Sequence, residues 1–186
     1  MFETDADHAK LPPRSQMTKL IVFDLDETLW SLSDGYCALM KAPFKRHGDQ
    51  VSDASGLLLT LRADARETLD TLQKQGFVLS VASRTTPETG GAVLDLLGML
   101  DYFTCPCFAW QDKDLSLKRV FEDLDREKGI RISPGEALFI DDWPSNIRDA
   151  RKLGVSGLVF GRDIQSLSEI LKHVNGSGDK HAIRSL

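Results

Sequence analysis

The stretch L-I-V-F-D-L-D-E-T-L-W, from Leu20 to Trp30, decides the fold of this 186-residue chain. A short apolar run ends in two aspartates, Asp24 and Asp26, and its β-branched and aromatic residues predict a buried strand of a parallel sheet. Ligands of open α/β sheets bind beyond the carboxyl ends of such strands. Two carboxylates there repel each other without a cation, which favours a magnesium site that handles phosphate. The alternative is an Asp that caps a turn beside a second, solvated Asp.

Two later apolar runs also end in polar side chains. F-V-L-S-V-A-S-R reaches Ser83 and Arg84, and A-L-F-I-D-D ends in Asp141 and Asp142. Between these two runs, an amphipathic segment over 115–128 is predicted to be a helix and carries Lys118.

The order of these motifs is more specific than any one of them. A strand-end Asp, a strand-end Ser, a Lys and a strand-end Asp-Asp resemble the four-motif pattern of the haloacid dehalogenase-like superfamily. Within that superfamily, D-L-D-x-T-L-W, A-S-R-T, D-D-x-x-x-N-I and the late Arg162-Asp163 pair resemble the magnesium-dependent phosphatase family. The resemblance covers roughly residues 19–174.

The first motif suggests the chemistry. A carboxylate nucleophile divides phosphate ester hydrolysis into two easier displacements through an aspartyl-phosphate, and Asp24 fits that role. Asp26 is then placed to protonate the leaving oxygen and later to deprotonate the attacking water. The resemblance also implies that the backbone carbonyl of Asp26 reaches the metal.

The resemblance assigns further roles. Ser83 would hydrogen-bond the phosphoryl group, and Arg84 would contact phosphate or a second substrate group, although a surface ion pair is an equal alternative for this arginine. Asp141 would bind Mg²⁺ directly, and Asp142 would bind it through water or orient the other ligands, so the metal set is Asp24, Asp26, Asp141 and Asp142. Asn146 resembles a partner of these ligands, the alternative being a solvated helix residue.

Two positions depart from the family pattern. Glu27 stands where the family often has Tyr, so an aromatic contribution from that position is absent. Counting along the helix places Leu117, not a lysine, at the expected site. Lys118 is the nearest candidate for the catalytic lysine, and Lys113 in the preceding loop is the reserve.

Strand and helix patterns alternate along the chain, which predicts an α/β fold with an open, doubly wound, parallel five-stranded sheet of Rossmann-like, haloacid-dehalogenase type. The domain is expected to cover 19–174, with an irregular flap or lid over 31–60 and no full cap domain. Residues 1–18 and 175–186 are predicted to be disordered or mobile tails. Strands are expected at 19–24, 77–82, within 101–108, at 137–140 and 157–160, and helices at 63–75, 87–97, 115–128, 144–153 and near 164–174.

Composition excludes other classes of protein. A net charge of −5 provides no basic surface for nucleic acid, and no apolar stretch approaches the roughly 20 residues of a membrane span. The N-terminus does not resemble a secretory signal, and the odd number of cysteines, 3, predicts free thiols in the reducing cytoplasm. A serine hydrolase is disfavoured because G-x-S-x-G is absent and the histidines lie in tails or loops.

Trp30, Trp110 and Trp143 could flank the pocket mouth, although core packing is the commoner role of Trp.

The expected activity is therefore that of a Mg²⁺-dependent phosphomonoesterase. An open site suggests a phosphorylated small molecule, or a phosphotyrosyl or phosphosugar group carried on a phosphorylated or glycated protein. The alternatives are a different phosphohydrolase or phosphotransferase of small metabolites on the same scaffold, and a non-catalytic binding module. The intact aspartates disfavour the second alternative.

Overall fold

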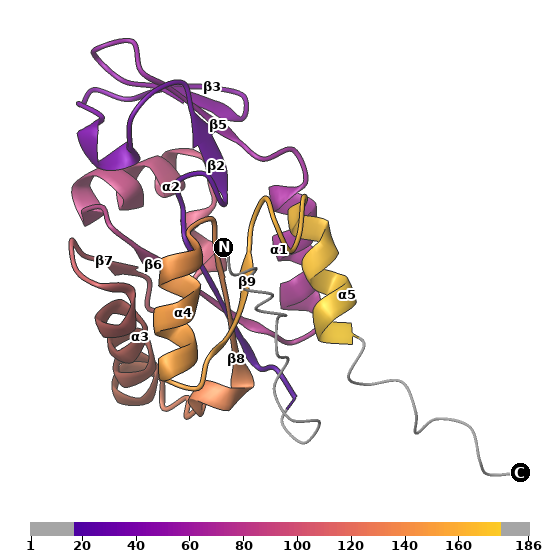
Figure 1. The fold of residues 1–186 in the computed structure, drawn as a ribbon. Coiled ribbons are helices and arrows are strands. Elements are labelled where there is room, and N and C mark those ends of the chain that lie inside the picture. Colours follow the sequence, from indigo (N-terminus) through magenta and orange to yellow (C-terminus); the bar gives the residue numbers. More distant parts are fainter. Residues whose placement is uncertain (1–16, 176–186) are drawn as a thin grey trace, which may run out of the picture.

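A parallel five-stranded sheet lies at the centre of the computed structural model, which describes residues 17–175 (Figure 1). Its strand order is β7-β6-β1-β8-β9, and every pairing is parallel. The strands are β1 (Leu20–Phe23), β6 (Val78–Ser83), β7 (Cys107–Phe108), β8 (Ala137–Asp141) and β9 (Ser156–Val159). The predicted sheet is confirmed, and β1 occupies its middle, so the residues that follow β1 lie between the ends of β6 and β8.

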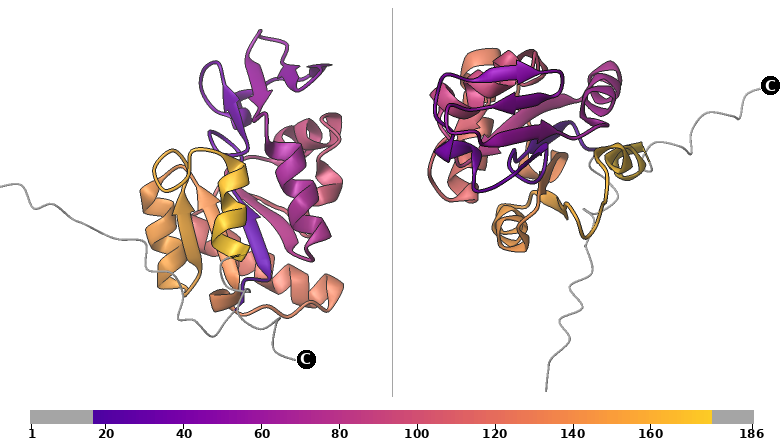
Figure 2. Two further views of the ribbon diagram at one scale, coloured as in Figure 1. Left: turned by 90° about the vertical axis from the view of Figure 1, so that its right-hand side faces the viewer. Right: turned by 90° about the horizontal axis from the view of Figure 1, so that it is seen from above.

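Helices cover both faces of this sheet (Figures 1 and 2). The α-helices are α1 (Ala65–Lys74), α2 (Ala92–Leu96), α3 (Lys113–Lys128), α4 (Pro144–Lys152) and α5 (Ile170–Asn175). Side chains of β1 alternate between two apolar clusters: Ile21 and Phe23 pack with α1, α2 and α5, and Leu20 and Val22 pack with α3 and α4. The doubly wound arrangement is thereby confirmed.

Short helical turns join these elements. They are η1 (Cys37–Leu39), η2 (Pro87–Gly91), η3 (Leu100–Tyr102), η4 (Pro134–Glu136) and η5 (Leu167–Glu169). The helix predicted at 87–97 begins as the π-helical turn η2 before α2, and α3 begins two residues earlier than predicted. The earlier start of α3 brings Lys113 into the helix.

A second sheet stands above the carboxyl ends of the main strands (Figure 1). It is antiparallel, with the order β2-β5-β4-β3, and is called the flap here, residues 30–61. Its strands are β2 (Trp30–Leu32), β3 (Lys45–His47), β4 (Gln50–Ser52) and β5 (Leu58–Leu61). The expectation of an irregular segment was wrong, because Val51, Leu59 and Leu61 alternate into the core and order the strands despite their shortness.

The predicted tails at 1–18 and 175–186 fall almost entirely outside the residues that the structure describes. Within residues 17–175, no helix combines the length and apolar character needed to cross a bilayer.

Candidate active site

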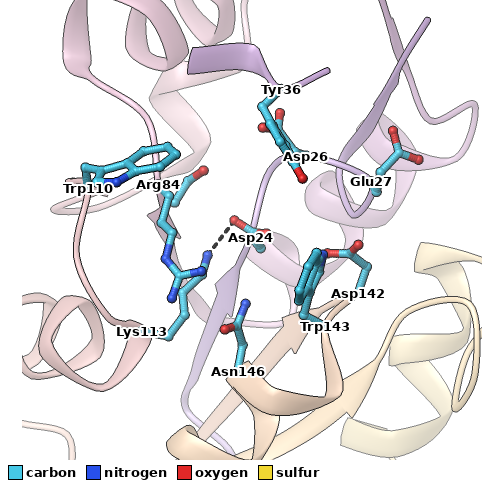
Figure 3. Close-up of a pocket in the computed structure, with 11 residues that line it drawn as sticks. Asp24, Asp26, Glu27, Tyr36, Arg84, Trp110, Lys113, Asp142, Trp143 and Asn146 are labelled. Carbon is cyan, nitrogen blue, oxygen red and sulfur yellow. Dashed lines mark hydrogen bonds and ion pairs between the residues drawn. The ribbon is translucent and has the colours of Figure 1, made fainter. Parts of the chain in front are cut away.

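A cavity of about 290 Å³ opens where β1, β6 and β8 end (Figure 3). Its walls come from the main sheet, from the loops beyond it and from the flap. The lining residues are Asp24, Asp26, Glu27, Tyr36, Ser83, Arg84, Trp110, Lys113, Asp142, Trp143 and Asn146. Side chains predicted from three separate motifs therefore meet in one pocket.

A buried ammonium lies at the base of this pocket. Nζ of Lys113 donates hydrogen bonds to Oδ1 of Asp24 and to the carbonyl oxygen of Ala82, each over 2.7 Å, and lies 3.4 Å from Oδ2 of Asp141. Only 2% of the lysine side chain is exposed. One positive charge thus lies between Asp24, which follows β1, and Asp141, which ends the neighbouring strand β8. The hydrogen bond from Lys113 fixes the orientation of the Asp24 carboxylate (Figure 3).

The expectation that Lys118 fills this position was wrong. Lys118 lies on the exposed face of α3, where it pairs with Asp114 over 3.2 Å. Lys113, the reserve candidate, precedes the buried Leu117 by four residues, so both project from the same face of the helix. Lys113 was only the reserve because the predicted helix begins at residue 115, although the spacing of Lys113, Leu117 and Val120 matches one helix face.

Three carboxylates can hold a cation here. Asp24, Asp141 and Asp142 each offer an oxygen atom, and these atoms all lie within 4.8 Å of one another. Burial raises the pKa of Asp141 to about 6 and that of Asp142 to about 7, and in both cases neighbouring carboxylate charge adds to the effect. Carboxyl groups this close together ionise reluctantly without a positive charge beside them. A divalent cation that prefers oxygen ligands would supply that charge.

Asn146 orients one member of this set. Its Nδ2 donates to Oδ1 and Oδ2 of Asp141 over 2.9 and 3.0 Å, and the backbone N–H of Trp143 also donates to Oδ1 over 2.8 Å. Asn146 is buried in the first turns of α4. The expectation that it supports a metal ligand agrees with this geometry, and the alternative of a solvated helix residue does not.

Asp26 lies on the flap side of the pocket. Its Oδ1 accepts a hydrogen bond from Nε1 of Trp30 over 2.7 Å, and its Oδ2 accepts one from the backbone N–H of Cys37 over 3.0 Å. Burial raises the pKa of Asp26 to about 6 against the lowering effect of these two hydrogen bonds. A carboxyl group with such a pKa can hold or release a proton near neutral pH, as a general acid and base must.

Ser83 and Arg84 lie at the end of β6. Ser83 is almost fully buried and lines the pocket. Nε of Arg84 donates to the carbonyl oxygen of Gln111 over 3.0 Å, and its guanidinium lies 3.6 Å from the exposed Asp112. Arg84 therefore forms the surface ion pair that was one of its two predicted roles. It also lines the pocket, and its contact with substrate stays a prediction.

Aromatic side chains surround the mouth of the pocket. Tyr36, Trp110 and Trp143 all line it and are exposed, by 51%, 74% and 54%. Trp30 does not join them, because its side chain is completely buried at the start of β2 and donates to Asp26. Tyr36 was not predicted, since nothing in the sequence of the flap indicates that residue 36 reaches the pocket.

Known proteins resemble this chain over most of its length. Residues 16–168 match the family described as Acid Phosphatase. The chain is 33% identical over 163 residues to Magnesium-dependent phosphatase 1 of Homo sapiens, covering 85% of this chain and 88% of that protein. It is 29% identical over 174 residues to the HAD-like hydrolase superfamily protein P8B7.31 of Schizosaccharomyces pombe, covering 87% of this chain and 97% of that protein.

A solved structure has the same fold. The crystal structure of a HAD-superfamily hydrolase from Ehrlichia chaffeensis superposes with a TM-score of 0.63 at 15% sequence identity, covering 87% of this chain and 98% of that one.

Proposed function

Because this chain belongs to the acid phosphatase family and is a phosphatase of the haloacid dehalogenase-like superfamily, we propose that it hydrolyses phosphate monoesters with Asp24 as nucleophile. The observation that carries this proposal is the buried ammonium of Lys113, held 2.7 Å from Asp24 and 3.4 Å from Asp141. It orients the nucleophile and adds positive charge where a phosphate must bind. Asp142 lies beside these groups, as a site for a bound cation requires.

The proposed reaction has two displacements. An Asp24 carboxylate oxygen attacks phosphorus, the ester P–O bond breaks, and the leaving oxygen takes the electron pair of that bond together with the proton of Asp26. The Asp26 carboxylate then takes a proton from water as the water oxygen attacks phosphorus and the bond to Asp24 breaks. The products are the alcohol and inorganic phosphate, and both aspartates return to their initial states.

The other residues bind and orient the phosphoryl group. Ser83 donates a hydrogen bond to a phosphoryl oxygen, and Arg84 contacts the phosphate or a second substrate group. Asp24, Asp141 and Asp142 would hold Mg²⁺, with the backbone carbonyl of Asp26 as a further ligand. When bound, this cation neutralises the charge that the nucleophile and the phosphate share.

An activity assay tests this proposal. Purified protein should hydrolyse p-nitrophenyl phosphate in Mg²⁺, lose turnover in excess EDTA and recover it when Mg²⁺ is restored. Asp24→Asn should abolish turnover with Mg²⁺ present. Full activity in EDTA, or an active Asp24→Asn enzyme, would contradict the proposal.

The mouth of the pocket suggests a substrate class. Tyr36, Trp110 and Trp143 offer aromatic faces beside the phosphate site, so we favour an aryl ester such as a phosphotyrosyl group over a phosphosugar. Their exposure is compatible with a phosphate carried on a protein. Trp110→Ala should therefore lower kcat/KM for phenyl phosphate more than for a sugar phosphate. Leu39→Ala, a change at an exposed apolar residue that does not line the pocket, is the control, and equal losses on both substrates would contradict the aryl preference.

A cytoplasmic location is also proposed. Cys37, Cys105 and Cys107 are free thiols, which suits a reducing compartment. Microscopy and cell fractionation of the tagged full chain test this, and recovery of the protein from an oxidising compartment would contradict it.

A further inference from the structure

The side chain of Asp26 is held by the flap and not by the main sheet. Within residues 17–175, its carboxylate accepts hydrogen bonds from Nε1 of Trp30 over 2.7 Å and from the backbone N–H of Cys37 over 3.0 Å. Trp30 begins β2, and Cys37 begins η1. Each carboxylate oxygen thus has one donor, and both donors belong to the flap.

Both donors are firmly positioned. Trp30 has no exposed surface and pairs through its backbone with Leu61 of β5. The side chain of Cys37 is likewise fully buried, and it joins the same apolar cluster as Trp30. The position of the flap therefore determines where the carboxylate of Asp26 points.

The flap also reaches the mouth of the pocket. Tyr36 directly precedes Cys37, has an extended backbone, is 51% exposed and lines the cavity (Figure 3). A leaving group that rests against the Tyr36 ring contacts the residue next to the amide that holds Asp26. The residue at the mouth, Tyr36, and the residue whose N–H holds Asp26, Cys37, are therefore adjacent in the chain.

The nucleophile is positioned by other parts of the fold. Asp24 follows the central strand, its N–H donates to the carbonyl oxygen of Ile140 over 2.9 Å, and Lys113 from α3 holds its carboxylate. The two aspartates lie two residues apart, yet the main sheet and α3 position one while the flap positions the other. A change in the flap can therefore disturb the second aspartate and leave the first in place.

We propose that Trp30 and the Tyr36–Cys37 pair are positioning residues that align Asp26 with the leaving oxygen, and that a leaving group seated on Tyr36 strengthens this alignment. This rests on the proposed role of Asp26 as general acid and base. The flap then selects substrates through the rate of leaving-group departure as well as through binding.

Two aryl esters test the proposal, because phenyl phosphate needs a proton at its leaving oxygen and p-nitrophenyl phosphate needs one far less. Trp30→Phe removes the indole N–H and retains an aromatic ring. We expect kcat/KM to fall at least about tenfold for phenyl phosphate and no more than about threefold for p-nitrophenyl phosphate. In an Asp26→Asn background, Trp30→Phe should cause no further loss, because the two residues act as a unit.

Tyr36→Ala is the second variant, and its exposed position allows it to decide the matter if Trp30→Phe does not fold. It should lower kcat/KM more for phenyl phosphate than for p-nitrophenyl phosphate, because kcat/KM reports the step in which the leaving group departs. Equal losses of kcat/KM on both esters, or a loss from Trp30→Phe that persists beside Asp26→Asn, would show a merely structural role and overturn the proposal. If Asp26→Asn itself lowered kcat/KM equally for both esters, the acid–base role in the proposed function would fail, and this inference with it.

Discussion

Replacing Lys113 with Met removes the ammonium at the base of the pocket and retains a chain of similar length. Asp24 then loses a partner at 2.7 Å, and Asp141 loses a positive charge at 3.4 Å. The two carboxylates are left close together without compensation. Lys118→Met is the matched control, since this lysine lies on the same helix in an exposed pair with Asp114.

The expected loss of stability follows from these distances. At 2.7 Å, the attraction between the ammonium and Asp24 is about 6 kcal/mol at an effective dielectric constant of about 20. Desolvation of the lysine offsets part of this energy, and removing one partner of a buried pair costs about 3–5 kcal/mol. Because the raised pKa of Asp141 allows that group to take up a proton, we expect a loss near the lower limit, about 3 kcal/mol, or a Tm lowered by about 6–12 °C.

Thermal unfolding in EDTA and in Mg²⁺ measures this loss. Lys113→Met should be destabilised in EDTA and should regain part of its Tm in Mg²⁺, because a bound cation replaces the missing charge. Its kcat/KM in Mg²⁺ should fall at least about a hundredfold, the scale of losing one charge-stabilising group in a preorganised site. Lys118→Met should lose at most about 0.5 kcal/mol and keep its activity. A Lys113→Met enzyme with the Tm and activity of the wild type would contradict the proposed role of Lys113.

Three further predictions concern one residue in the site, one in β9 and one in the flap. Asn146→Ala removes both hydrogen bonds from its amide to Asp141 and should weaken Mg²⁺ affinity about 10–100-fold, as measured by titration of activity against Mg²⁺. Gly157→Ala would place a Cβ 2.8 Å from the side chain of Ile147 and should cost about 1–3 kcal/mol in urea unfolding. Although partial burial opposes it, hydrogen bonds from backbone N–H groups and a hydroxyl lower the pKa of Asp53 to about 2. Its contribution to stability is complete above the unfolded pKa near 4 and is lost as pH falls through about 2, so the Tm difference between wild type and Asp53→Asn should shrink over that range.

Much of the main sheet could be predicted because its strands are short, continuous apolar runs. The run before Asp24 and the run before Asp141 both lie in a sheet that is covered on two faces, so burial leaves a clear signal in the sequence. The carboxyl ends of parallel strands meet at one edge, which is why the aspartates and Ser83 could be expected together.

The flap and the lysine were harder to predict for different physical reasons. Strands of three or four residues carry little periodicity, and β3 (Lys45–His47) is entirely exposed, so no apolar pattern marks it. Lys113 depends on where α3 begins, and a boundary shift of two residues decides whether the lysine belongs to the helix. The hydrogen bond from the backbone N–H of Cys37 to Asp26 depends on how the flap returns over the site, which no local pattern records.

Trapping the aspartyl-phosphate on the protein is the decisive test of the proposed mechanism. In Asp26→Asn, p-nitrophenyl phosphate should still phosphorylate Asp24, while hydrolysis of the intermediate is slowed. Rapid acid quench and peptide mass mapping in Mg²⁺ should find one phosphoryl group on Asp24, and none in EDTA or in Asp24→Asn. A phosphoryl group on another residue, or continued turnover with none on the protein, would contradict the proposed role of Asp24 as nucleophile.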